Sequence, residues 1–206
     1  MADTLATVAD LAAQLQLDEA DLNPTTAALL LETATAVVQA AAGGQRIVQV
    51  VDDEVVLDLD EHDGGPYLTL PQRPVTAVSS VLVGATTVTD WLPQFRRSRL
   101  WRSSGWRGPA GWYRRGAPST VTVVYTHGYP PDDQRIQFAR AAVLGLAAGA
   151  YSSPAGAKSE RIDDYAVTYD TMASQLVASP ALEARLRQQY GRPPGSVPLV
   201  AGRSRW

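Results

Sequence analysis

The spacing of apolar residues changes twice along this chain, and these changes restrict its possible folds more than any other feature. Apolar residues recur at helical spacing in residues 5–15 and 27–41, alternate in short runs between residues 47 and 125, and return to helical spacing in residues 136–150. A period near 3.6 predicts a helix with one buried face, whereas a period of 2 predicts a strand. The sequence therefore predicts an α+β protein in which helices precede and follow a β region.

We expect a helical frame of about four helices, built from residues 1–44 and 130–191, with an antiparallel β region inserted at residues 45–129. Residues 1–191 would then form a single domain. Residues 192–206 contain three prolines and two glycines and show no periodicity. This composition predicts an extended C-terminal tail.

Capping residues predict where the helices begin and end. The signals for a start are Thr4 or Thr7, Asn23 with Pro24, Asp132 beside Asp133, and Ser179 with Pro180, and the signals for an end are Gly43, Gly44 and Gly191. A loop rich in Gly, Ser and Pro follows the third helix, and we expect one further strand after it, before Asp170.

Five short runs rich in β-branched residues predict the strands of the β region, which are residues 47–51, 55–59, 67–70, 75–83 and 120–125. Asp52 and Asp53 are expected in a turn between the first two runs. After the last run, Gly128 is expected to have a positive φ. His127 would cap the strand end or bond to the turn that Gly128 and Tyr129 form.

Charge is distributed unevenly along the chain. Residues 1–70 hold 13 acidic residues and one arginine, whereas residues 71–115 hold eight arginines and one aspartate. Three interpretations remain open. The charges are scattered over a solvated surface, an acidic face of one copy meets a basic loop of the next, or the basic loop contacts nucleic acid.

Residues 96–116, the Arg/Trp segment, combine basic and aromatic side chains with glycines and a proline, and they predict a loop or a long hairpin tip. The candidate contact residues are Arg96, Arg97, Arg99, Trp101, Arg102, Trp106, Arg107, Trp112, Arg114 and Arg115. Arginine and aromatic residues are typical of protein interfaces, and they also bind and stack on nucleic acid. Alternatively, the tryptophans fold back on the β region and the arginines remain in solvent.

The sequence contains no recognisable reaction centre. It has no cysteine, and His62 lies among four consecutive turn residues, 60–63, that cannot all point at one metal ion. Phosphate-binding loops and nucleophile elbows are missing from the sequence. No apolar run approaches the ~20 residues that span a bilayer. We therefore expect a protein that is not an enzyme, binds no cofactor or metal, avoids membranes and is made in the cytoplasm.

Several joints of the chain resemble one known family. They are the run Tyr125–Pro130 before an Ala-rich helix, then Gly156, Ser159, Glu160, Ile162, Asp164, Tyr165, Val167 and Tyr169, together with the opening Leu5–Leu11 and the strand Pro74–Val78. This order resembles the head-to-tail connector, or adaptor, proteins of tailed bacteriophages, especially phages of actinobacteria. The resemblance covers most of the chain.

The resemblance implies a structural protein of the virion neck. Such adaptors form a ring, usually of twelve copies, beneath the portal, where they extend the channel for double-stranded DNA and carry the stopper or tail-completion protein. Their C-terminal segments dock on the portal, which would make residues 192–206 an arm with the anchors Val197, Leu199, Val200, Arg203, Arg205 and Trp206. The alternatives are another neck protein of the stopper type and a nucleic-acid-binding module that uses the Arg/Trp segment.

Overall fold

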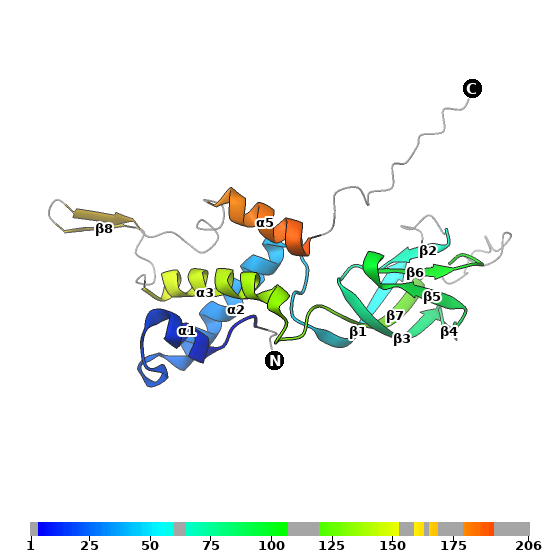
Figure 1. Ribbon diagram of the computed structural model, residues 1–206, viewed down its shortest axis with the longest axis horizontal. Coiled ribbons are helices and arrows are strands. Elements are labelled where there is room, and N and C mark those ends of the chain that lie inside the picture. The colour runs from blue at the N-terminus through cyan, green and yellow to red at the C-terminus, as the bar shows by residue number, and fades with distance from the viewer. Residues whose placement is uncertain are drawn as a thin grey trace, which may run out of the picture. The chain divides into compact units, whose positions relative to one another are not determined.

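The structure, a computed structural model, describes residues 4–59, 65–106, 120–152, 159–162, 165–168 and 179–191. The chain forms two compact units. The helical unit comprises residues 1–45 and 138–206, and the β unit comprises residues 46–137. Figure 1 shows the elements of both units, and helices and antiparallel strands together confirm the α+β class.

Local capping explains where the first two helices begin. α1 (Val8–Leu15) starts at Thr7, whose hydroxyl accepts from the backbone N–H of Asp10 while the Asp10 carboxylate accepts from the backbone N–H of Thr7. The 3-10 turn η1 (Glu19–Asp21) leads to α2 (Pro24–Ala41). Asn23 caps α2 with its side chain, and positive φ values at Gly43 and Gly44 follow its end. The predicted signals for α2 are confirmed.

The third helix begins differently from the prediction. Asp133, and not Asp132, provides the cap, because its side chain accepts from the backbone N–H of Arg135 at 2.8 Å. That cap opens the 3-10 turn η3 (Gln134–Ile136), and α3 (Gln137–Ser152) continues from it. The fourth helix of the frame, α5 (Pro180–Tyr190), starts and ends where the sequence predicts, although Ser179 makes no side-chain capping bond.

Polar contacts and small residues hold the helical unit together. An ion pair joins Arg140 of α3 to Asp10 of α1 at 2.5 Å, and the guanidinium of Arg185 in α5 lies 4.6 Å from the ring of Phe138. Alanines and branched aliphatic residues form the buried core between the helices: Leu11, Ala12, Ala27, Leu31, Ala34, Val38, Ala139, Val143, Ala147 and Leu186. The small alanines allow the helix backbones to approach closely.

The region after α3 contains two strands, where the sequence predicted one. β8 (Ser159–Ile162) pairs antiparallel with β9 (Tyr165–Thr168) in a hairpin. The remaining residues between α3 and α5 lie outside the described ranges.

Two antiparallel sheets form the β unit. The larger one has the order β1-β7-β3-β4 and contains β1 (Val50–Asp58), β3 (Val75–Val83), β4 (Thr86–Thr87) and β7 (Thr120–His127). The smaller one has the order β2-β6-β5 and contains β2 (Tyr67–Thr69), β5 (Trp91–Gln94) and β6 (Arg99–Arg102), with the 3-10 turn η2 (Phe95–Arg97) between the last two.

Side chains of both sheets meet in one core. Its buried members are Leu59, Leu68, Leu70, Val75, Val81, Leu100, Trp106, Val121, Val123 and Tyr125. Alternate residues of β7 belong to this core, as the period of 2 requires. The core therefore lies on one face of the larger sheet, against the smaller sheet.

The turn predicted at Asp52 and Asp53 is wrong. β1 is one continuous strand through both residues, with a register shift between Val50 and Asp53 and a positive φ of 52° at Asp52. A bulge of this kind accommodates an extra residue without ending the strand. The two runs that the sequence separates therefore belong to one edge strand.

Candidate interaction surfaces

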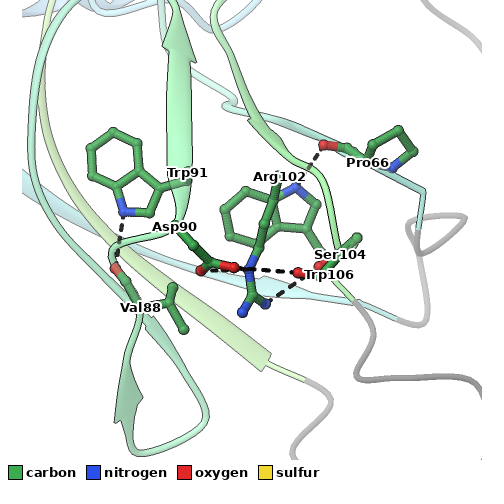
Figure 2. A network of polar contacts seen from close by, with 8 residues as sticks. Pro66, Val88, Asp90, Trp91, Arg102, Ser104 and Trp106 are labelled. Carbon is green, nitrogen blue, oxygen red and sulfur yellow. Dashed lines mark hydrogen bonds and ion pairs between the residues drawn. The ribbon is translucent and has the colours of Figure 1, made fainter.

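The Arg/Trp segment contributes one strand and a polar network to the β unit. The Nε of Arg102 donates to both carboxylate oxygens of Asp90, at 2.8 and 2.9 Å, and its Nη1 donates to the carbonyl of Gly105 at 3.3 Å. Ser104 donates to Asp90 as well (Figure 2). The hydrogen bonds from Arg102 lower the pKa of Asp90. The charge of Arg102 is thus neutralised within the hairpin.

Two tryptophans of this region are tied to the fold. Trp106 is 1% exposed, and its indole N–H donates to the carbonyl of Pro66 at 3.2 Å (Figure 2). The indole N–H of Trp91 donates to the carbonyl of Val88 at 3.0 Å. Since the Trp106 ring is enclosed by the core, a partner cannot reach it in this fold.

The structure separates the candidate contact residues of the Arg/Trp segment. Arg96 and Arg97 are exposed, Arg99, Trp101 and Arg102 are partly buried, and Trp106 is a core residue. Arg107, Trp112, Arg114 and Arg115 lie outside the described residues, as do the arm residues Val197, Leu199, Val200, Arg203, Arg205 and Trp206. Arg102 and Trp106 have structural roles, so a contact surface in the described part of the segment depends on Arg96 and Arg97.

Leu92, Phe95, Arg96 and Arg97 form an exposed group that we call the basic turn. Leu92 is 61% exposed and Phe95 is 45% exposed, and both arginines, which follow Phe95 directly in the chain, are exposed as well. Within the described part of the chain, neither the Arg96 nor the Arg97 side chain makes a hydrogen bond or an ion pair. One hairpin thus carries two exposed apolar side chains and two exposed cations.

The outer side of β1 carries a second exposed group, Glu54, Val56 and Asp58, which we call the acidic face. These residues alternate with Val55 and Leu57, which pack against the core. Val56 is 58% exposed. Strand periodicity therefore points both carboxylates and one apolar side chain away from the core.

A buried histidine lies where β7 ends. The Nε2 of His127 is 2.9 Å from Oδ2 of Asp53 in β1, and Oδ1 of Asp53 is 3.7 Å from Nη1 of Arg46. His127 thus contacts the adjacent strand, which differs from the strand-end or turn role expected from sequence. The adjacent Asp53, interpreted as a turn residue, is its partner.

The turn after His127 has the expected backbone. Gly128 has a φ of +85°, which confirms the prediction for this residue, and its N–H donates to the carbonyl of Pro74 at 2.9 Å. Tyr129 then bonds to the segment before β1, donating to Ile47 at 2.9 Å and accepting from Gln49 at 2.8 Å. These bonds hold the start of the β unit beside the residues that follow β7.

Tyr125 closes the core below this turn. Its ring lies 5.1 Å from that of His127, and its hydroxyl accepts from the backbone N–H of Gln72 at 3.3 Å. Burial raises the pKa of Tyr125 to about 12. The phenol therefore stays protonated and structural at neutral pH.

Within the described ranges, no group of three or more His, Cys, Asp or Glu side chains is arranged to hold a metal ion. None of the described helices has the length and apolar character of a membrane span. The side chains that stand out here are those of the basic turn and the acidic face, and they suit contacts between macromolecules.

Comparison with known proteins gives a likeness at the level of the fold. No family model and no curated protein matches the sequence. A chain in the neck of an empty gene transfer agent (GTA) particle, computed with C6 symmetry, has a TM-score of 0.55 at 22% identity over 89% of both chains. A chain in the virion of the native particle has a TM-score of 0.55 at 21% identity over 89% of both chains.

A third chain of similar fold comes from the neck of the native particle, computed with C12 symmetry. Its TM-score is 0.50 at 20% identity, over 91% of this chain and 94% of that one. The likeness extends over both units, because a match to either unit alone would cover a much smaller share. The chain therefore shares its fold, over 89–91% of its length, with chains of a GTA particle.

Proposed function

We propose that this chain is a structural subunit in the neck of a phage-like particle. One observation carries the proposal: a chain from the GTA neck shares the fold over 89% of both chains. A helical frame with an inserted β unit of two sheets is a more distinctive fold than either part alone, so a match to both parts carries more weight than a match to one. The order of joints that resembles phage adaptors supports the same conclusion from the sequence.

Within the neck, we propose the role of the head-to-tail adaptor. Twelve copies would form a ring under the portal, extend the channel for double-stranded DNA without reading its sequence, and carry the stopper or tail-completion protein. The C12 symmetry used for the native GTA neck supports the copy number. Residues 1–191 would form the body of the subunit, and residues 192–206 the arm that docks on the portal.

The described side chains support a structural role over an enzymatic one. Asp53, His127 and Tyr125 connect strands within the β unit. Asp10 holds a helix cap and an ion pair to Arg140. These ionisable groups thus have partners that stabilise the fold.

A role as a nucleic-acid-binding module is less well supported. It would use the arginines and tryptophans of residues 96–116 together, yet Arg102 is paired with Asp90 and Trp106 is buried. The acidic face lies in the same unit and would repel phosphates. A stopper-type neck protein remains the second candidate, because the likeness is to chains of the neck as a whole.

Imaging of particles tests the proposal. The chain would be produced together with portal-bearing capsids, and the vertex would be reconstructed with and without residues 192–206. We expect a ring of the full-length chain directly on the portal, and its loss on deletion of the arm. Density at another level of the neck would favour the stopper, and absence of the chain from the particle would overturn the proposal.

DNA binding is measured separately on the purified chain. The adaptor role predicts weak binding that changes little when Arg96 and Arg97 are replaced by alanine. A nucleic-acid-binding module predicts instead a steep fall in affinity with salt that these substitutions abolish.

A further inference from the structure

The acidic face and the basic turn lie on different sides of the β unit. β1 is the edge strand of the larger sheet, and Glu54, Val56 and Asp58 point to the side opposite the core. η2 belongs to the β5-β6 hairpin of the smaller sheet, which packs on the core side. One subunit therefore presents two separate surfaces.

The basic turn is held in a fixed conformation. Ser98, which follows it, is 5% exposed and has a φ of 48°, and its carbonyl accepts from the backbone N–H of Leu70 at 2.9 Å. Its own N–H donates to the carbonyl of Phe95 at 3.1 Å. Arg96 and Arg97 therefore project from a pre-ordered turn, and little backbone entropy is lost when a partner binds.

The two surfaces are complementary in charge and similar in composition. Each combines exposed apolar side chains with charges of one sign: Val56 with two carboxylates, and Leu92 and Phe95 with two guanidinium groups. Complementary electrostatic potentials guide association and fix its register, whereas contacts between like charges are disfavoured. Because the two surfaces lie on different sides of the β unit, a two-fold contact through either one would set it against the same surface of the other copy and bring like charges together, so a head-to-tail contact is favoured.

Main-chain pairing at the edge of β1 is a poorer alternative. The bulge at Asp52, with its positive φ, interrupts the regular edge, and the strand carries the acidic residues Asp53, Glu54 and Asp58 after the bulge. Bulges and charges are the features by which proteins prevent unwanted pairing of edge strands. A contact through side chains of the outer face is compatible with both the bulge and the charges of β1.

We propose that neighbouring copies meet through these surfaces, with the basic turn of one copy on the acidic face of the next. The inference rests on the proposed function, because it describes contacts within the proposed ring. Leu92 and Phe95 would cover Val56, and Arg96 and Arg97 would pair with Glu54, in the negative potential to which Asp58 contributes. Exposed ion pairs are individually weak, so a portal that gathers the copies would promote assembly by raising their effective concentration.

Cysteine cross-linking tests this contact with little background, because the chain contains no cysteine. Three variants would be assembled on portal-bearing capsids and treated with a short bis-maleimide: Glu54→Cys, Arg97→Cys and the double variant. We expect a ladder of dimers and larger oligomers from the double variant only. In a head-to-tail ring, each single variant keeps its cysteines apart and should remain monomeric on a denaturing gel.

The outcomes separate this inference from the function on which it rests. Variants that are present on the particles but give no ladder would overturn the contact and leave the neck role intact. Cross-linked dimers from either single variant would also overturn the proposed contact, because they would show that the same surface of two copies meets. Absence of the wild-type chain from particles would overturn the proposed function instead.

Charge reversal provides a second measurement on the same pair. Glu54→Lys and Arg97→Glu should each reduce incorporation into particles by about fivefold, the effect of losing an exposed ion pair of about 1 kcal/mol. The chain with both substitutions restores opposite charges across the contact and should recover most of the incorporation. Additive losses in the double variant would contradict the pairing.

Discussion

Replacing Gly128 with alanine should destabilise the β unit strongly, for two reasons that the structure separates. Its φ of +85° is unfavourable for any residue with a Cβ, and that Cβ would lie closer than 3.0 Å to the carbonyl carbon and oxygen of Val48. The neighbouring backbone is fixed by the hydrogen bonds of Tyr129 to Ile47 and Gln49. The clash cannot be relieved without disturbing those bonds.

The expected loss follows from these two contributions. The left-handed conformation costs an alanine about 1–2 kcal/mol, and weakening the two backbone hydrogen bonds adds about 1 kcal/mol each. The free energy of unfolding should therefore fall by about 3–4 kcal/mol. Gly43 provides a matched control, because its φ is +80° but a Cβ there meets nothing within 4 Å. Gly43→Ala should show only the conformational cost, about 1–2 kcal/mol.

Urea unfolding measures both losses if each unit is followed by its own signal. Four of the five tryptophans lie within residues 46–137, so their fluorescence reports the β unit, which contains Gly128. Circular dichroism at the helical wavelength reports the helical unit, which contains Gly43. Separate signals are needed because two units need not unfold in one step. Equal losses for the two variants would refute the steric argument.

Three further substitutions test other contacts. In the wild-type chain, the stabilisation from the protonated Tyr125 side chain should be fully present below pH 10. The free energy of unfolding should then fall by roughly 1–3 kcal/mol as the pH rises toward 12, since the folded state holds the Tyr125 proton more tightly than the unfolded state does. Tyr125→Phe should remove this fall, and an alkaline profile that the substitution leaves unchanged would contradict the prediction. Burial alone would raise the pKa of Asp10, but hydrogen bonds from Arg140 and its own cap lower it overall, so this carboxylate stabilises the fold above its ordinary pKa and the effect disappears as pH falls through the lowered one. Asp10→Asn should thus cost about 1 kcal/mol at pH 7 in thermal unfolding, and the cost should shrink as the pH falls below the ordinary pKa of an aspartate; a cost that stays constant at acid pH would count against the cap. Trp106→Phe should lower the free energy of unfolding by about 1–2 kcal/mol, because a hydrogen bond and buried volume are lost. Trp101→Phe should lower it by less, and the reverse order in urea unfolding would argue against a buried Trp106 indole.

Local chemistry was sufficient to predict the helices. Asn23 and Gly43 act on neighbouring backbone groups, so their effects are readable from a few adjacent letters. The cap of η3 shows the limit of this reasoning. Asp132 and Asp133 are chemically identical, and only the path of the chain decides which carboxylate reaches the N–H of Arg135.

The β unit was less predictable because distant pairing decides it. β5 contains Pro93, and β6 has two adjacent large apolar residues between two arginines, so neither resembles a run of β-branched residues. Each becomes a strand by pairing with the other and with β2. Asp53 and His127 are 74 positions apart, and a contact over such a separation has no signal in a single sequence.

Contacts between segments far apart in the sequence also changed which residues belong to the candidate surfaces. Composition grouped all arginines and tryptophans of residues 96–116, whereas the fold gives Arg102 and Trp106 internal partners and leaves Arg96 and Arg97 exposed. The acidic face could have been found from the alternation of Glu54, Val56 and Asp58 with Val55 and Leu57. The assumed turn at Asp52 and Asp53 prevented the strand from being followed across its bulge.

The hydrogen bonds between Tyr129 and the segment Ile47–Gln49 have a consequence for the history of the chain. They hold residues 47–49, where the chain enters the β unit, beside Tyr129, which follows the strand β7, so the sheets of this unit begin and end at adjacent positions. A module with adjacent ends can be inserted into, or removed from, a host domain without rethreading the rest. The helical frame could therefore have existed before the β unit, and related chains could exchange this module while keeping the frame.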